Sequence, residues 1–331
     1  MIEKLTVYNS ETTDPYLNLA TEEYLTFHTE PSECILFLWQ NAHTVVIGRN
    51  QNCWKECHVT ELENDGGQLA RRLSGGGAVY HDLGNLNFTF CLRKAEADVD
   101  RQLQVIINAA ARFGLDAKKS GRNDAIISDR KFSGNAFFDS HGFYYHHGCI
   151  LINTNSQDLA RYLNPSSAKL KAKGVDSVRA RVVNLAELNP SVTTDSFRSA
   201  MIAAASDVYN LPATPLSVAR LNQDEIKTIA DRLKSREWKY GRKIPFTSSI
   251  SRRFAWGEVE FAVKCAGDII EDALLASDSM DHKWFEAIGP QFRGCYYNAS
   301  AICAVLTPLL VTRQVPSNVI DDITSMLKNC I

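Results

Sequence analysis

The sequence predicts an α+β protein with a large N-terminal domain and a small C-terminal one. Its 331 residues are 45% hydrophobic and 22% charged, which is ordinary globular composition and enough chain for two cores. Strand-like and helix-like stretches alternate up to residue 246. Beyond it, two or three strands between residues 249 and 275 precede helices near 299–310 and 316–328, an order typical of a separate α+β unit. We therefore expect domains at residues 1–246 and 247–331.

The first helix of the large domain is predicted from its start signals. Asp14 is a favourable N-cap residue, and Pro15 suits the first helical position. The helix should end near Phe27. Its expected buried stripe consists of Tyr16, Leu19, Ala20, Tyr24 and Phe27.

The other elements of the large domain are predicted from apolar runs and periodicity. Alternation over residues 85–92 predicts a half-buried strand, and Gly114 ends a helix expected over 101–113. Residues 121–136 favour two strands joined by a tight turn. Further strands are expected at 4–9, 35–39, 44–47, from 69 onward and at 143–153, and further helices at 59–64, 194–209 and 224–235.

Composition narrows the class of protein. A formal net charge of −2 gives no electrostatic case for nucleic-acid binding, and no apolar run is long enough to span a membrane. The acidic N-terminal stretch resembles neither a secretory signal nor a transit peptide. Nine scattered cysteines indicate reduced thiols, so we expect a cytoplasmic protein. From the charge and the short apolar runs we expect neither nucleic-acid nor membrane partners.

Residues 71–82 contain the densest group of unusual residues, Arg-Arg-Leu-Ser-Gly-Gly-Gly-Ala-Val-Tyr-His-Asp. Successive glycines let a backbone approach a ligand closely and can form an anion-binding nest. Arg71 or Arg72 could hold a carboxylate or phosphate. The run matches neither a P-loop nor a dinucleotide fingerprint, and a glycine run between strands is also typical of a loose hairpin turn.

A second polar group surrounds Lys131. A lysine in a strand often protects a solvated edge, but its ammonium can also bind a phosphate or carboxylate. Asn123 and Asp124 carry oxygens of the kind that Mg²⁺ accepts beside substrate phosphates, and they suit a turn equally well. His146 and His147 are adjacent in a strand and must face opposite sides of the sheet. The basic segment 169–181 suits either a solvated face or a lid over an anion.

In order along the chain, these motifs resemble the lipoate-protein ligase A family of the two-domain bacterial type. The resemblance is carried by residues 71–82, by Gly-Arg-Asn-Asp at 121–124, by Asp-Arg-Lys-Phe-Ser-Gly at 129–134, and by 37–39, 45–49, 146–148, 173–179 and 238–241. It implies a biotin/lipoate ligase-like catalytic domain, a mixed β-sheet flanked by helices, followed by a small accessory domain.

The resemblance implies a reaction in two steps. Lipoate would attack the α-phosphate of ATP, with Mg²⁺, to give lipoyl-AMP and pyrophosphate. A lysine of a lipoyl domain would then take the acyl group. Implied acceptors are the E2 subunits of 2-oxoacid dehydrogenases and the glycine cleavage H protein. Both steps need positioning and charge neutralisation more than proton transfer.

The resemblance also assigns roles to residues. Lys131 would be catalytic, and the segment 173–179 would close over the adenylate. The lipoate-binding residues would be Trp39, Arg72, Ser74, Gly75, Gly76, Lys131 and His147. The ATP or adenylate would contact Arg72, Gly77, Ala78, Val79, Tyr80, Asn123, Asp124, Lys131 and Gly174. Mg²⁺ would be held by Asn123 and Asp124.

Three alternative functions share part of this pattern. Octanoyltransferases of similar architecture use a nucleophilic cysteine where this chain has Tyr144, and we expect Cys149 to point to the other face of the sheet from the His147-Gly148 pair. A lipoyltransferase that accepts ready-made lipoyl-AMP would keep the same pocket. A non-catalytic sensor of lipoate or its adenylate would bind ligand without releasing pyrophosphate.

Overall fold

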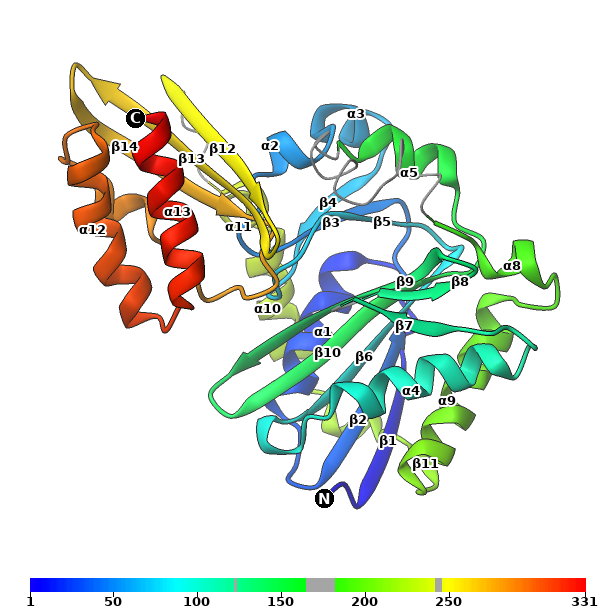
Figure 1. The fold of residues 1–331 in the computed structure, drawn as a ribbon. Coiled ribbons are helices and arrows are strands. Elements are labelled where there is room, and N and C mark those ends of the chain that lie inside the picture. Colours follow the sequence, from blue (N-terminus) through cyan, green and yellow to red (C-terminus); the bar gives the residue numbers. More distant parts are fainter. Residues whose placement is uncertain (122–123, 165–181, 242–245) are drawn as a thin grey trace. The chain divides into compact units, whose positions relative to one another are not determined.

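The structure, a computed structural model, describes residues 1–121, 124–164, 182–241 and 246–331 (Figure 1). These residues form two compact units. One consists of Met1–Val46, Cys57–Arg71 and Val79–Lys239, and the other of Ile47–Glu56, Arg72–Ala78 and Tyr240–Ile331. The three glycines of the sequence motif therefore pack with the C-terminal part of the chain.

The first unit is built on an eight-stranded mixed sheet with strand order β11-β1-β2-β6-β10-β9-β8-β7. Strand β1 runs parallel to β2 and β11, and the remaining neighbours are antiparallel. The strands are β1 (Lys4–Asn9), β2 (Glu33–Trp39), β6 (Asn85–Arg93), β7 (Lys118–Ser120), β8 (Asp124–Ile127), β9 (Arg130–Ser140), β10 (Phe143–Leu151) and β11 (Ala213–Pro215). The mixed sheet confirms the predicted fold class.

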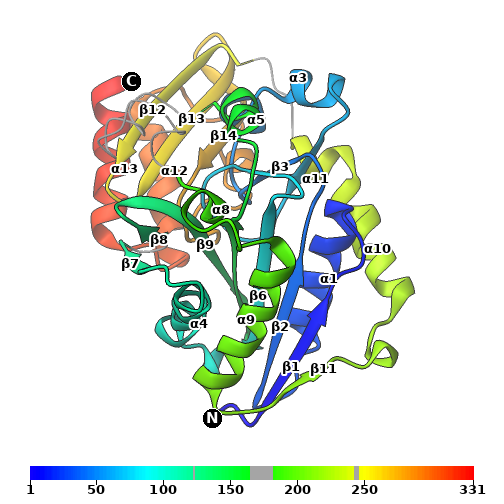
Figure 2. The ribbon, with the colours of Figure 1, turned by 90° about the vertical axis from the view of Figure 1, so that its right-hand side faces the viewer.

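Helices cover both faces of this sheet. Figure 2 shows α4 (Val99–Ala111) and α9 (Thr194–Tyr209) on one side and α1 (Pro15–Phe27) and α10 (Gln223–Lys234) on the other. Helix α1 begins as predicted, because Asp14 accepts hydrogen bonds from the backbone N–H groups of Tyr16 and Leu17. Phe27, expected in its buried stripe, is only half-buried.

Shorter elements complete the first unit. A small sheet has the order β4-β3-β5, with β4 (Gln68–Arg71), β3 (Thr44–Ile47) and β5 (Val79–His81). The short helices are α3 (Val59–Asn64), α5 (Ser156–Tyr162), α8 (Leu185–Leu188) and α11 (Arg236–Tyr240), and three-residue 3₁₀ turns occur at Lys94–Glu96 and Val218–Arg220.

The prediction that residues 85–92 form a half-buried strand is wrong. Strand β6 lies between β2 and β10, and every residue from 85 to 92 is buried. Leu86, Phe88 and Phe90 contribute to the core on the α4 and α9 side. The alternating polar residues Asn87 and Thr89 face the other side, which α1 covers. A buried polar face usually needs a network of hydrogen bonds or a ligand.

The second unit holds an antiparallel sheet β12-β13-β14 with β12 (Ser248–Phe254), β13 (Gly257–Ala266) and β14 (Ile269–Ser277). A 3₁₀ turn (Gly289–Phe292), α12 (Ala299–Thr312) and α13 (Ser317–Cys330) follow, and the short α2 (Cys53–Glu56) belongs to the same unit. Phe261, Ile302 and Ile323 lie at the centre of its core. Among the described residues, none of the helices is both long and apolar enough to cross a membrane.

Candidate active site

Five positions in register across five strands point to the same face of the large sheet. Trp39 of β2 pairs with Asn87 of β6, which pairs with Cys149 of β10. Cys149 pairs with Gly134 of β9, and Gly134 pairs with Asp124 of β8. Because paired residues share a face, the predicted site residues Trp39 and Asp124 lie on the same side of the sheet.

The adjacent histidines of β10 face opposite sides, as predicted. His147 is two residues from Cys149 and therefore shares its face, while His146 lies on the side of Phe88 and Phe90. The prediction that Cys149 points away from the His147 face is wrong, because alternation returns to the same face at every second residue. The Cys149 side chain is buried, with its sulfur 3.9 Å from the carbonyl oxygen of Gly134.

Lys131, the predicted catalytic residue, forms an ion pair with Asp124. Its Nζ lies 2.7 Å from Oδ1 of Asp124, and the two side chains are 21% and 12% exposed. The backbone carbonyl of Lys131 accepts a hydrogen bond from the N–H of Val183. The ammonium is thus partly desolvated and held by the carboxylate of Asp124. In such a site the charge of the ammonium would attract an anionic ligand more strongly than it would in water.

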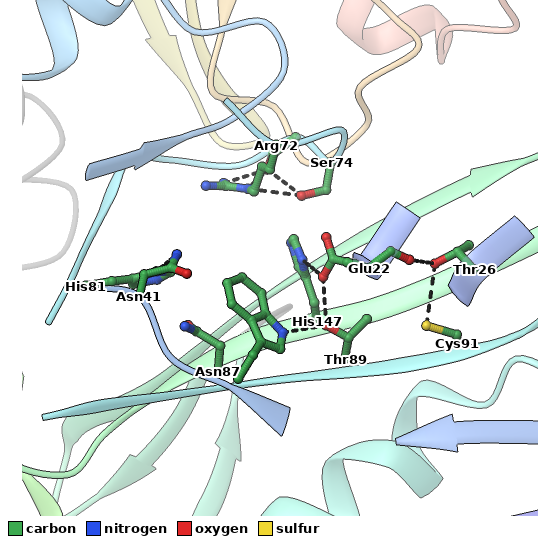
Figure 3. Close-up of polar contacts among 12 residues, drawn as sticks. Glu22, Thr26, Asn41, Arg72, Ser74, His81, Asn87, Thr89, Cys91 and His147 are labelled. Atoms are coloured by element: carbon green, nitrogen blue, oxygen red, sulfur yellow. Dashed lines mark hydrogen bonds and ion pairs between the residues drawn. The ribbon is translucent and has the colours of Figure 1, made fainter. Parts of the chain in front are cut away.

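A chain of hydrogen bonds links Trp39 and His147 through a residue that the sequence analysis did not identify, Glu22 of α1 (Figure 3). Nδ1 of His147 lies 2.8 Å from Oε1 of Glu22, and Oγ1 of Thr89 donates to the same oxygen at 2.7 Å. The indole N–H of Trp39 donates to Oγ1 of Thr89 at 3.1 Å. A carboxylate oxygen can accept both bonds, one from the hydroxyl of Thr89 and one from Nδ1 of a His147 tautomer that carries its proton there. The network therefore fixes the orientation of both predicted lipoate contacts.

A signal for Glu22 was present in the sequence. It follows Leu19 by three positions and precedes Thr26 by four, so it falls on the buried stripe of α1. Glu22 is 2% exposed in the structure. A carboxylate in an apolar stripe is rarely buried without partners, so it marks a polar site beneath the helix.

His146 has a different environment. It is fully buried, with Nδ1 2.9 Å from Oε1 of Gln102 and Nε2 2.9 Å from Oδ1 of Asn135. Burial, helped by the neighbouring charge of His147, lowers the pKa of His146 to about 3. His146 is therefore a neutral part of the packed core.

The glycine run of the second unit is shaped by Arg72 (Figure 3). Its Nε donates to Oγ of Ser74 at 3.0 Å, and its Nη2 donates to the carbonyls of Gly75 and Gly77 at 2.7 and 2.8 Å. Arg72 is 6% exposed, and its guanidinium thus fixes the curvature of the loop backbone through these bonds. Ligand roles for Arg72, Ser74 and these glycines stay predictions.

Gly75 and Gly76 also have a packing role within that unit. A Cβ at Gly75 would lie 2.3 Å from the carbonyl oxygen of Ser279, closer than two such atoms approach. The N–H of Gly76 donates to the same carbonyl at 3.0 Å, and Gly76 has a φ of +87°. The glycines therefore let the loop lie directly against the backbone that follows β14.

Two further motif residues lie in the first unit. Arg71 donates from Nε to the carbonyl of Trp238 at 2.9 Å, and the indole N–H of Trp238 donates to the carbonyl of Arg71. Tyr80 of β5 packs against the rings of His43 and Tyr162. Val79 precedes it in the strand, and Ala78 ends the glycine segment of the second unit.

Several predicted residues lie outside the described part of the chain. These are Asn123, Gly174 and the remainder of the segment 173–179. Among described residues, no group of three or more histidine, cysteine, aspartate or glutamate side chains could hold a metal ion.

Comparisons with known proteins agree on one family. Residues 14–206 match the model of the lipoyl protein ligase A/B catalytic domain, and residues 243–327 match the bacterial lipoate protein ligase C-terminus. A lipoate-protein ligase A from Psychrobacter cryohalolentis is 38% identical over 98% of both chains.

Solved structures give the same result. P. falciparum LipL1 in complex with lipoate is 28% identical, has a TM-score of 0.82, and is matched over 98% of this chain and 99% of its own. A bipartite lipoate protein ligase solved with its E2 lipoyl domain, from Thermoplasma acidophilum, is 26% identical with a TM-score of 0.63, over 74% of this chain and 99% of its own. The chain therefore belongs to the lipoate-protein ligase A family and is a ligase.

Proposed function

We propose that the protein is an ATP-dependent lipoate-protein ligase that makes lipoyl-AMP and then transfers the lipoyl group to a lysine of an acceptor domain. The observation that supports this most strongly is one face of the sheet. It carries the Lys131–Asp124 ion pair together with Trp39 and His147, which Glu22 holds in place. A cation on the same face of the sheet as an oriented aromatic and imidazole pair suits an acid with an apolar tail.

In the first step, a carboxylate oxygen of lipoate attacks the α-phosphorus of ATP. The bond from that phosphorus to the bridging oxygen breaks, and pyrophosphate leaves. Lys131 brings the two anions together and neutralises the charge that grows between them. Trp39 and His147 hold the acyl chain, so that the carboxylate is presented at the ammonium.

In the second step, the amine of an acceptor lysine attacks the acyl carbon. The bond to the phosphate oxygen of AMP breaks, AMP leaves, and the attacking nitrogen loses a proton to form the amide. An adenylate is needed because a free carboxylate is a poor electrophile for an amine. Proposed acceptors are the E2 subunits of 2-oxoacid dehydrogenases and the glycine cleavage H protein. The Thermoplasma relative is paired with an E2 lipoyl domain.

We infer that ATP enters as its Mg²⁺ complex. Mg²⁺ is commonly bound by one or two carboxylates plus substrate phosphates, so the single carboxylate of Asp124 fits a metal that arrives with its nucleotide. The ion would neutralise phosphate charge beside Lys131. A cytoplasmic location is also proposed, because all nine cysteines are free thiols.

The test is pyrophosphate release with ATP, Mg²⁺ and lipoate, measured with and without a lipoyl-domain acceptor. We expect release that requires lipoate, and an acceptor mass gain that matches a lipoyl amide. If no pyrophosphate appears but supplied lipoyl-AMP modifies the acceptor, the protein is a transferase whose activating step lies elsewhere. Binding of lipoate without either product would identify a sensor.

A further inference from the structure

The path of the Lys131 side chain depends on an irregularity between β8 and β9. Ala125 pairs with Ser133 and Ile126 pairs with Lys131, so Phe132 is an extra residue on β9. Such a β-bulge bends the strand and changes the direction of the side chains beside it. Phe132 itself is fully buried in the core on the α4 and α9 side. Because of the bulge, the direction of the Lys131 side chain does not follow the regular alternation of the strand.

Beyond the bulge, Lys131 lies over a position that has no side chain. A Cβ built on Gly134 would lie 2.5 Å from Nζ and 2.7 Å from Cε of Lys131. Within the described residues, these two atoms are the ones that such a Cβ would meet. Gly134 is also the direct cross-strand partner of Asp124. The lysine thus reaches its carboxylate by crossing the surface that Gly134 leaves open.

The backbone conformation at position 134 does not itself require glycine. Gly134 lies inside β9, paired with Asp124 on one side and Cys149 on the other, and its φ is not positive. A glycine within a strand weakens it and often marks a place where another group approaches closely. At Gly134 the approaching group is the ammonium of Lys131.

We propose that Gly134 is a positioning residue. Because it has no side chain, it leaves the space in which Asp124 holds the Lys131 ammonium, ready for the anionic substrates. Any side chain at position 134 displaces the ammonium from the face that carries Trp39 and His147. The proposal rests on the proposed function, because it describes how the lysine of that reaction is aimed.

The experiment is a double-mutant cycle with Gly134→Ala, Lys131→Ala and the double variant. The probe is a non-hydrolysable sulfamoyl analogue of lipoyl-AMP, and its affinity is measured by calorimetry. Loss of a charge-assisted contact predicts that Gly134→Ala weakens binding by about tenfold or more in the Lys131 background. In the Lys131→Ala background the same substitution should change affinity by less than about twofold, since non-additivity identifies groups that act through one another.

Folding is checked in the same cycle. If Gly134→Ala proves unstable, the proposal predicts that the double variant regains the melting temperature of Lys131→Ala, because the clashing side chain is gone. Equal losses of affinity in both backgrounds would overturn the proposal, as would full affinity of Gly134→Ala. Failure of the wild-type protein to bind the probe would instead count against the proposed function.

Discussion

The adjacent histidines of β10 show how differently the two faces of one sheet are used. His146 is enclosed by Gln102 and Asn135 among aromatic side chains, and burial keeps it neutral. His147 is paired with the buried carboxylate of Glu22. Two adjacent residues thus differ in kind, because His146 completes a core and His147 is oriented by a buried carboxylate. The difference implies that substitutions on the His147 face change activity, whereas those on the His146 face change stability.

The largest effect on the His147 face is expected for Lys131→Ala. Loss of a group that stabilises developing charge commonly reduces turnover by about a hundredfold to a thousandfold. We therefore expect adenylation, measured as lipoate-dependent pyrophosphate release, to fall to background. Lys118→Ala provides a matched control, since that lysine lies on the edge strand β7 with its side chain 68% exposed. Near-normal adenylation in a folded Lys131→Ala variant would remove Lys131 from the reaction.

A smaller effect is expected for Glu22→Gln, which keeps the shape of the side chain and removes its charge. The bonds from His147 and Thr89 would lose their charge-assisted strength, so the orientation of His147 and Trp39 would loosen. We expect the KM for lipoate to rise by about tenfold, with little change in the KM for ATP.

The control for this prediction is the neighbouring residue of the same helix. Glu23 pairs with Arg232 of α10 and takes no part in the network. Glu23→Gln should leave the KM for lipoate unchanged. Equal effects of the two substitutions would mean that α1 tolerates no amide at either position, and that Glu22 has no special role in orienting the acyl pocket.

Sequence motifs identify candidate residues that would act through their own chemistry more readily than residues that act through others. Lys131, Asp124, Trp39 and His147 were named from motifs, and the structure brings these four to one face. Glu22 belongs to no motif: its position in the apolar stripe of α1 indicates burial, but its partners His147 and Thr89 come from distant strands. The cross-strand register of Gly134 with Asp124 depends on a β-bulge, and no local sequence pattern predicts that bulge.

The opposite face can be tested through its pH dependence. His146 has a pKa of about 3 in the folded protein, against an ordinary value near 6.5, so the unfolded chain takes up this proton first as the pH falls. The contribution of neutral His146 to the free energy of unfolding is therefore present above pH 6.5 and is lost progressively towards pH 3. Between pH 6.5 and pH 5 the loss should be about 1–2 kcal/mol.

His146→Phe should remove this slope, although it lowers stability at every pH because the bonds of the imidazole to Gln102 and Asn135 are lost. Another buried group, Glu33, titrates outside this window. Burial favours its neutral form, but hydrogen bonds from Arg220 and Thr6 outweigh burial and lower the pKa of Glu33 to about 2, so its contribution is lost only below pH 4.5. The free energy of unfolding, measured with denaturant at pH 5 and pH 6.5, therefore reports the protonation of His146 and not that of Glu33. Parallel curves for the variant and the wild-type protein would show that His146 takes up its proton equally in the folded and unfolded chains, and the contrast between the two histidines would then fail.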